Sequence, residues 1–185
     1  MVLKILRESG GHTDLPKDVR TLVHTPRNIP TESKCSGEYM YDSIHKGILE
    51  SFSLHPGLMP VNIIKLDMNI DGLPLCKSSK SQLWPILGSI NSCDHVFSIA
   101  TFHGVAKPDP VDEFLLDFIN EANEYLDNGI NINDKYYHFQ IRAIICDAPA
   151  RAFIKCIVSH TGYFSCERCL NKGQSYKSRI VYKQC

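Results

Sequence analysis

The chain has 185 residues with 20 basic and 20 acidic side chains, so its formal net charge is zero. This balance argues against a basic nucleic-acid coat protein, an acidic tail and a charge-driven membrane-surface protein, because each needs an excess of one sign of charge. Hydrophobic residues make up 43% and charged residues 22%, the composition of a folded protein rather than a disordered one. We expect one domain preceded by a short segment, since a chain of this length can remove roughly 70% of its unfolded surface from water.

The sequence predicts an intracellular protein with reduced cysteines. No run of about 18 apolar residues is present, and the N-terminus has no apolar signal core before a small-residue cleavage site. The eight cysteines are scattered, and several lie in or beside apolar stretches, where a reduced thiol packs as a small hydrophobe. Cys166 and Cys169 form the one spaced pair, so we expect a metal knuckle rather than a disulfide scaffold.

Residues 1–57 are predicted to form an N-terminal approach segment with one or two helices. Three prolines interrupt residues 1–40, which leaves room for a short helix around Lys17–Val23. Apolar residues at helical spacing predict a second helix over Tyr39–Leu54, ended by the breaker His55-Pro56-Gly57.

Residues 58–160 begin with an expected meander of three strands. Apolar and polar residues alternate from Val61 to Ile70, the pattern of a strand with one buried face. A second strand is expected over Ser81–Ile90, where Pro85 suits a sheet edge or a bulge. A third runs from about His95 to Phe102. Their short connections favour an antiparallel arrangement.

A helix, a strand and another helix are expected next. The first helix begins at Pro110 with Asp109 as its cap and stops at Asn128-Gly129, and its unbroken apolar stripe indicates that it covers a sheet. A strand follows over Tyr136–Cys146, and a helix over Ala148–Val158. This order predicts an α/β fold with a mixed sheet and helices packed on it.

Two aspartates follow apolar strands directly, Asp71 after Ile70 and Asp147 after Cys146. Carboxylates on neighbouring strands can hold a pair of divalent cations about 4 Å apart, which activate water and stabilise the leaving oxygen in phosphodiester chemistry. The alternative is a turn-forming Asp71 and a helix-capping Asp147, and spacing alone favours it. Asp67 and Asn69 share a strand face with Asp71, so the sequence does not decide which of these residues would bind the metal.

Cys166 and Cys169 enclose two charged residues in a short turn. Such a pair supplies half of a tetrahedral zinc site. A thioredoxin-type redox motif is the rival, but it requires the pair at the start of a helix directly after a strand, and Gly162-Tyr163-Phe164 precedes it here. A chance pair is the third alternative. A complete zinc site needs two more ligands, and His160 and Cys185 do not form a familiar second half.

Several sequence blocks carry a resemblance. They are IDGLPL (70–75) with KSS (77–79) and WPIL (84–87), HGVAKP (103–108), ICDAPA (145–150), and HTGYFSCERC (160–169). In this order they resemble the transposase-domain proteins of animal DNA transposons, in the broad CACTA-like group of DDE/D transposases. The similarity spans about residues 15–182. It implies a catalytic core with an RNase H-like fold.

The resemblance implies a role for each candidate residue. Asp71 would be the first catalytic acid and Asp147 the second, together holding Mg²⁺ or Mn²⁺. Cys166 and Cys169 would be the cysteine half of a zinc site in an insertion that begins at residues 161–185. The implied partner is DNA at transposon ends, the implied location is the nucleus, and a homo-oligomer is compatible with the family.

The sequence departs from the family pattern after Asp147. A third acid and the paired histidines of the zinc site have no convincing candidates, since Glu167 lies inside the cysteine turn. We therefore expect an RNase H-like core that is incomplete at the C-terminus and does not cut DNA by itself. The alternative is a domesticated, non-catalytic module that binds nucleic acid or protein. A thiol-redox protein built on the cysteine pair is a further alternative.

Overall fold

The computed structural model describes residues 2–26, 28–58, 60, 62–76, 78–91, 93–158, 162–166, 168–169 and 171–182. The chain divides into two compact units, Met1–Thr31 and Glu32–Cys185. No helix among the described residues is long and apolar enough to cross a membrane.

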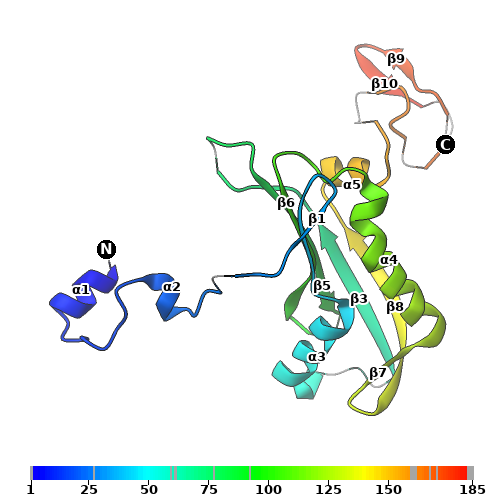
Figure 1. Ribbon diagram of the computed structural model, residues 1–185. Coiled ribbons are helices and arrows are strands. Elements are labelled where there is room, and N and C mark those ends of the chain that lie inside the picture. The colour runs from blue at the N-terminus through cyan, green and yellow to red at the C-terminus, as the bar shows by residue number, and fades with distance from the viewer. Residues whose placement is uncertain are drawn as a thin grey trace. The chain divides into compact units, whose positions relative to one another are not determined.

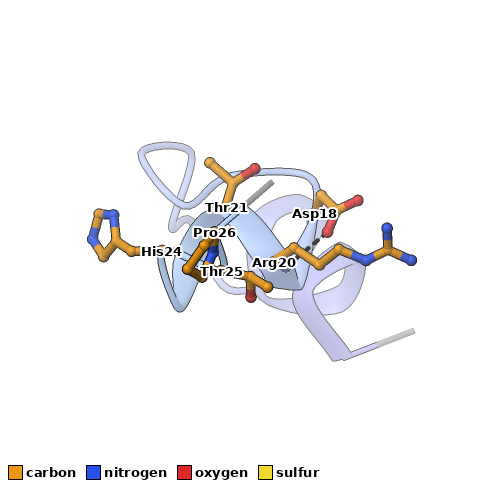
Figure 2. A pocket seen from close by; sticks show the side chains of 6 residues that line it. All are labelled: Asp18, Arg20, Thr21, His24, Thr25 and Pro26. Atoms are coloured by element: carbon orange, nitrogen blue, oxygen red, sulfur yellow. Dashed lines mark hydrogen bonds between the residues drawn. The ribbon is translucent and has the colours of Figure 1, made fainter. Parts of the chain in front are cut away.

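The N-terminal unit contains two short helices, α1 (Val2–Glu8) and α2 (Val19–Leu22). The helix expected around residues 17–23 thus forms, whereas α1 was not expected. Asp18 caps α2, because its Oδ1 accepts a hydrogen bond of 2.7 Å from the backbone N–H of Arg20. A hollow beside this helix is lined by Asp18, Arg20, Thr21, His24, Thr25 and Pro26 (Figure 2).

The second unit contains a mixed sheet with helices (Figure 1). Its elements are β1 (Glu32–Lys34), β2 (Gly37–Tyr41), α3 (Ile44–Leu54), the 3₁₀ helix η1 (Pro56–Leu58), β3 (Ile63–Ile70), β4 (Leu73–Pro74), β5 (Gln82–Ile90), β6 (Val96–Gly104), α4 (Val111–Asn128), β7 (Ile130–Ile132), β8 (Lys135–Ile145), α5 (Ala148–Ile154), β9 (Gln174–Tyr176) and β10 (Arg179–Val181). The large sheet has the order β1-β2-β6-β5-β3-β8-β7, with β4 paired to β5, while β9 and β10 form a separate hairpin. The expected mixed α/β class is confirmed.

The expected meander is the centre of this sheet. Strand β5 pairs antiparallel with β3 on one side and with β6 on the other. Helix α4 and the short strand β7 connect β6 to β8, and β8 then pairs with β3 in parallel, with Ile64 opposite Phe139. A crossover through a helix is what allows two strands of one sheet to run in the same direction.

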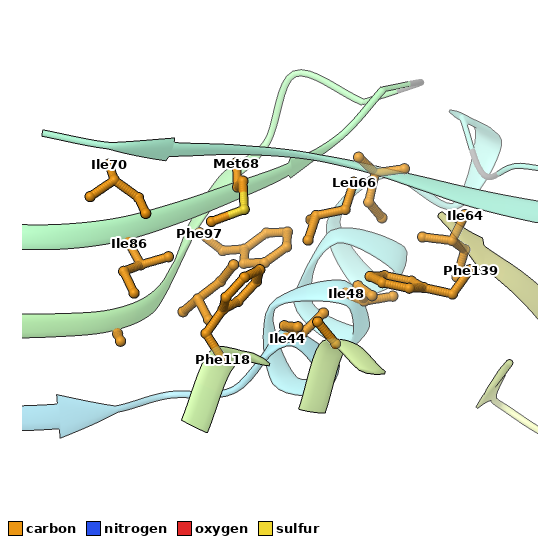
Figure 3. Packing of buried hydrophobic residues seen from close by; sticks show 14 of the residues in the cluster. Ile44, Ile48, Ile64, Leu66, Met68, Ile70, Ile86, Phe97, Phe118 and Phe139 are labelled. Atoms are coloured by element: carbon orange, nitrogen blue, oxygen red, sulfur yellow. The ribbon is translucent and has the colours of Figure 1, made fainter. Parts of the chain in front are cut away.

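The core lies between one face of the sheet and the helices α3 and α4. The buried side chains of β3 alternate along the strand and are Ile64, Leu66, Met68 and Ile70. Ile44 and Ile48 of α3 and Phe118 of α4 lie against this row (Figure 3). Full burial of one such side chain contributes about 1.5–3 kcal/mol to the stability of the fold. Burial of this shared apolar layer is therefore the main interaction that holds the helices on the sheet.

Residues 32–57 differ most from the expectation. The sequence predicts a helix from Tyr39, but residues 37–41 form β2, in which Tyr39 pairs with Phe102 of β6 and is fully buried. Helix α3 begins only at Ile44, after Ser43 accepts a hydrogen bond of 3.1 Å from the N–H of Lys46. Helical spacing is a local preference, and pairing with a distant strand overrides it. These residues therefore extend the sheet and its core instead of leading up to it.

Smaller differences concern the ends of elements. Pro110, not Asp109, is the N-cap of α4, and no side chain caps this helix. Gly129 ends α4 with a φ of 71°, as the sequence predicts. Pro85 lies in an inner strand rather than at an edge, and the irregularity in its pairing follows it between Ile86 and Leu87. Helix α5 is shorter than expected and ends at Ile154.

Candidate functional site

Asp71 and Asp147 lie at the same edge of the sheet. Strands β3 and β8 are adjacent and parallel, and Asn69 is paired with Ile145. Asp71 and Asp147 each follow two residues after one of these partners. Two parallel neighbours that end in register bring both aspartates to the carboxyl ends of the strands, the edge at which α/β sheets bind ligands.

One oxygen of each carboxylate is held by a backbone N–H. Oδ1 of Asp71 accepts a hydrogen bond of 2.7 Å from Gly72. Oδ1 of Asp147 accepts one of 2.7 Å from Ala150 and thereby caps α5. The turn and cap roles are therefore real, and they also orient the two carboxylates. Asp71 is half-buried and Asp147 is exposed, so solvent and ions reach the pair.

The thiol of Cys146 lies close to both aspartates. Burial raises its pKa above the ordinary value, and the charges of Asp147 and Asp71 raise it further. A hydrogen bond with the backbone of Ile70 and the charge of Arg151 act in the opposite direction. The closeness of the two aspartates is inferred from the strand register, in which Asn69 pairs with Ile145.

The other candidates on β3 have different partners. Both oxygens of Asp67 bond to the guanidinium of Arg142, with 2.6 Å between Nε and Oδ1 and a second bond from Nη2 to Oδ2. This ion pair raises the pKa of Arg142. Asn69 donates from its Nδ2 to the carbonyl of Ile145 over 3.0 Å. Asp71 is therefore the aspartate of this strand end whose second oxygen can take a ligand.

Aromatic side chains pack against the two segments that carry Asp71 and Asp147. A Cβ on Gly72 would lie 2.5 Å from Cζ2 of Trp84, so the turn that carries Asp71 rests on the indole. The indole ring lies 4.8 Å from the ring of Phe153 in α5, the helix that Asp147 caps. One buried side chain thus contacts both halves of the site. No role was expected for Trp84 from the sequence, although it lies in one of the blocks that carry the resemblance.

Lys107 was also missed as a site residue. Its Nζ lies 5.4 Å from the centroid of the Trp84 ring and 5.3 Å from that of Phe153. The HGVAKP block contains this lysine, and a charged residue inside a resemblance block was the available clue.

The two carboxylates fit a hard divalent cation. Mg²⁺ prefers oxygen ligands, keeps several waters and is often held by one or two carboxylates together with substrate phosphates. Within the described part of the chain, no group of three or more His, Cys, Asp or Glu residues could hold a metal ion. A metal ion at Asp71 and Asp147 would therefore need water or phosphate oxygens as its further ligands.

Cys166 and Cys169 lie half-buried in a loop near the C-terminus. The backbone N–H of Arg168 points to Sγ of Cys166 over 3.4 Å, an interaction that stabilises negative charge on sulfur. The described residues on either side form bends and turns, not the start of a helix after a strand, which argues against the thioredoxin-type alternative. Two possible further ligands, His160 and Cys185, and the acidic Glu167 lie outside the described residues.

The β9–β10 hairpin supports this cysteine loop. The hydroxyl of Tyr182 accepts a hydrogen bond of 2.8 Å from the N–H of Ser165 and donates one of 3.3 Å to the carbonyl of Gly162. Gly173 donates to the carbonyl of Tyr163 over 2.6 Å. The loop is therefore held by the hairpin that follows it, and two thiolates would form half of a zinc site there.

A separate polar network crosses the sheet at His103. Its Nε2 lies 2.8 Å from Oγ of Ser81, and its Nδ1 lies 3.3 Å from Oε2 of Glu38. A hydroxyl, an imidazole and a carboxylate also occur in this order in nucleophilic enzymes. Here 66% of the Glu38 side chain is exposed, so water screens its charge. The network connects β2 and β6 with the residue that precedes β5, and we assign it a structural role.

Comparison with known protein families, with curated proteins and with solved structures found no match. The fold and the site define a mixed α/β protein with two carboxylates at the ends of adjacent parallel strands.

Proposed function

We propose that this chain carries part of the catalytic core of a DDE/D-type DNA transposase with an RNase H-like fold. The observation that carries the proposal is the parallel register of β3 and β8, which brings Asp71 and Asp147 to one edge. The chain order of β3, β5, β6, α4, β8 and α5 also agrees with the order that the resemblance implies. Phosphodiester bonds of DNA are the proposed substrate, and transposon ends in the nucleus are the proposed target.

In this proposal the two aspartates hold Mg²⁺ or Mn²⁺ through the oxygens that do not bond to Gly72 and Ala150. A bound metal would supply activation of water and stabilisation of the leaving oxygen. The chain itself contributes fixed carboxylate positions, because a backbone N–H holds each of them. Among the described residues no third carboxylate joins the pair. We therefore expect weak metal binding and no cleavage of DNA by this chain alone.

The test measures Mn²⁺ binding by the full chain, from the electron paramagnetic resonance signal of the free ion. Asp71→Asn and Asp147→Asn should each weaken Mn²⁺ binding by at least about tenfold. Loss of a residue that only hydrogen-bonds to a metal ligand already costs about tenfold in metal affinity, and loss of a direct ligand costs at least as much. Asp134→Asn is the matched control, because Asp134 lies in the turn before β8, at the opposite end of that strand. Equal Mn²⁺ binding by all three variants would contradict the proposal.

We also propose that Cys166 and Cys169 bind zinc as a half site. Metal analysis of the purified chain should find less than one equivalent of zinc, and Cys166→Ser should remove it, because two thiolates hold zinc less tightly than the usual four ligands. Cys156→Ser is the control, since that cysteine is exposed after α5. Tight binding of one equivalent would show that further ligands complete the site.

A further inference from the structure

The ammonium group of Lys107 is held over two aromatic rings. Its Nζ lies within 5.4 Å of the ring centroids of both Trp84 and Phe153, inside the range of about 6 Å at which cations interact with aromatic faces. The lysine itself is exposed in the loop that follows β6. The structure therefore places a positive charge at a defined point that solvent can reach.

This point belongs to the edge of the sheet that carries the two aspartates. Strand β6 ends beside the start of β5, with Gly104 opposite Gln82. The start of β5 lies beside the end of β3, with Ile86 opposite Ile70. Lys107 follows Gly104, and Asp71 follows Ile70, so both leave the sheet at the same edge. Trp84 joins them, because it contacts Gly72 and lies beneath the lysine.

No carboxylate pairs with Lys107 inside the described part of the chain. Lys107 belongs to none of the ion pairs found there. Arg142, by contrast, gives both arms of its guanidinium to Asp67. Two neighbouring carboxylates repel a phosphate group, so a positive side chain close to them favours the approach of a nucleic-acid substrate.

We propose that Lys107 binds a backbone phosphate of the nucleic acid beside Asp71 and Asp147. The inference rests on the proposed function, because it names how the same site receives its substrate. A lysine suits this task, since its ammonium is a compact charge with three donors that can meet a phosphate from several directions. The rings of Trp84 and Phe153 hold it at the edge through which the DNA backbone approaches.

Trp84 provides a direct reporter, because it is the single tryptophan of the chain. A phosphate that binds Lys107 changes the charge above the indole and shifts its fluorescence. The experiment titrates the full chain, in EDTA, with a mixed-sequence DNA duplex and with one of its strands, and follows Trp84 emission over a range of salt concentrations. Lys107→Gln and Lys107→Arg are compared with Lys135→Gln. Lys135 also covers an aromatic ring, 4.8 Å from Tyr137, but lies at the start of β8.

Lys107→Gln should lower duplex affinity by about eightfold at about 0.1 M salt and reduce the salt slope by about 0.9, the loss of one phosphate contact. Lys107→Arg should retain most of the affinity, and Lys135→Gln should bind as the unchanged chain does. Unchanged Trp84 emission on addition of either DNA would overturn the inference. An equal loss of affinity in Lys107→Gln and Lys135→Gln would also overturn it.

The two proposals fail separately. DNA binding in EDTA does not depend on a metal, and Asp71→Asn should leave it unchanged or strengthen it, because one repulsive charge is lost. Mn²⁺ binding by Lys107→Gln should equal that of the unchanged chain. Intact Mn²⁺ binding without a Lys107-dependent DNA interaction would refute this inference alone. A Lys107-dependent DNA interaction without Mn²⁺ binding at Asp71 and Asp147 would refute the proposed metal chemistry.

Discussion

At the scale of single residues, Glu121 of α4 joins three elements through one carboxylate. It accepts hydrogen bonds from the backbone N–H of Ile44 over 2.7 Å and of His45 over 3.0 Å, at the start of α3. The hydroxyls of Tyr41 and Tyr125 donate to it as well. A negative charge at this position satisfies two unpaired N–H groups of α3 and interacts favourably with its helix dipole.

Glu121→Gln should therefore destabilise the protein. An amide cannot accept all of these bonds, and loss of hydrogen bonds to a charged group costs about 1.5–3 kcal/mol. Glu124→Gln is the control, because Glu124 is exposed on the same helix and its substitution should change stability by less than about 0.5 kcal/mol. Urea unfolding monitored by circular dichroism measures both. Equal midpoints would show that the carboxylate does not hold α3 in place.

The same scale shows which parts of the candidate site were predictable. Asp71 and Asp147 were visible in the sequence because an apolar strand pattern ends directly before each of them. Asp67 stayed open as a ligand, because its partner Arg142 is 75 positions away and sequence periodicity carries no information about such a contact. Trp84 was not identified for the same reason, since its contacts to Gly72 and Phe153 exist only in the folded chain.

At the scale of elements, α3 lies directly on the sheet because Gly47 has no side chain. A Cβ at this position would lie 1.9 Å from Cδ2 of Phe97 in β6. Next to it, Oγ of the buried Ser51 donates to the carbonyl of Gly47 over 2.9 Å and lies 2.9 Å from Nδ1 of His95. The approach of helix and strand therefore leaves no room for an added methyl group.

Gly47→Ala should lower stability although alanine favours helices. The intrinsic gain of about 1 kcal/mol is opposed by overlap with Phe97, and overpacking of a core costs about 1–3 kcal/mol. Gly57→Ala is the matched control, because nothing lies within 4 Å of a Cβ built there. Thermal unfolding should show a lower melting temperature for Gly47→Ala than for Gly57→Ala. The opposite order would mean that α3 can move away from β6 at little cost.

The β1–β2 and β9–β10 hairpins were among the elements that the sequence did not predict. The β1–β2 turn consists of Cys35 and Ser36 with φ values of 53° and 65°, and the β9–β10 turn of Lys177 and Ser178 with 46° and 62°. Two-residue hairpin turns with positive φ at both positions are recognised by Asn-Gly or Asp-Gly, and neither turn contains such a pair. The long helix α4 was predictable, because its apolar stripe and its Gly129 stop are local features.

At the scale of the whole molecule, the chain order of the core elements and the three-strand meander were predictable, and the other strand pairings were not. Three strands, a helix, a strand and a helix follow from local patterns, and the structure has them in that order. The place of β8 beside β3, and of β2 beside β6, depends on pairs such as Tyr39 and Phe102 that lie far apart in the chain. Such pairs are chosen by the burial of whole faces, which no short segment determines.

Buried thiol and phenol groups of the core determine how the stability of the protein changes at alkaline pH. Burial raises the pKa of Cys35 from 9.0 to about 11, and Glu113 adds to this. Burial likewise raises the pKa values of Tyr39 and Tyr41, with Asp117 and Glu121 adding to the respective shifts. These groups are neutral when protonated, so the folded state holds their protons more tightly than the unfolded state does. The contribution of Cys35 to stability is therefore complete below pH 9.0 and is lost as the pH rises toward about 11, whereas the two tyrosines lose theirs only above their ordinary pKa of 10.0.

We therefore expect the free energy of unfolding to fall steadily between pH 9.0 and about 11. The shift of Cys35 alone corresponds to about 3 kcal/mol over this window, because one pKa unit is about 1.36 kcal/mol and this thiol is buried. Cys35→Ser removes the titrating thiol but keeps a donor near the carbonyl of Pro110, so its curve should fall less steeply. Cys156→Ser should keep the full slope, because Cys156 is exposed. Urea unfolding at several pH values measures how steeply the free energy of unfolding falls with pH. Identical slopes for Cys35→Ser and the unchanged chain would show that Cys35 does not contribute to the alkaline loss of stability.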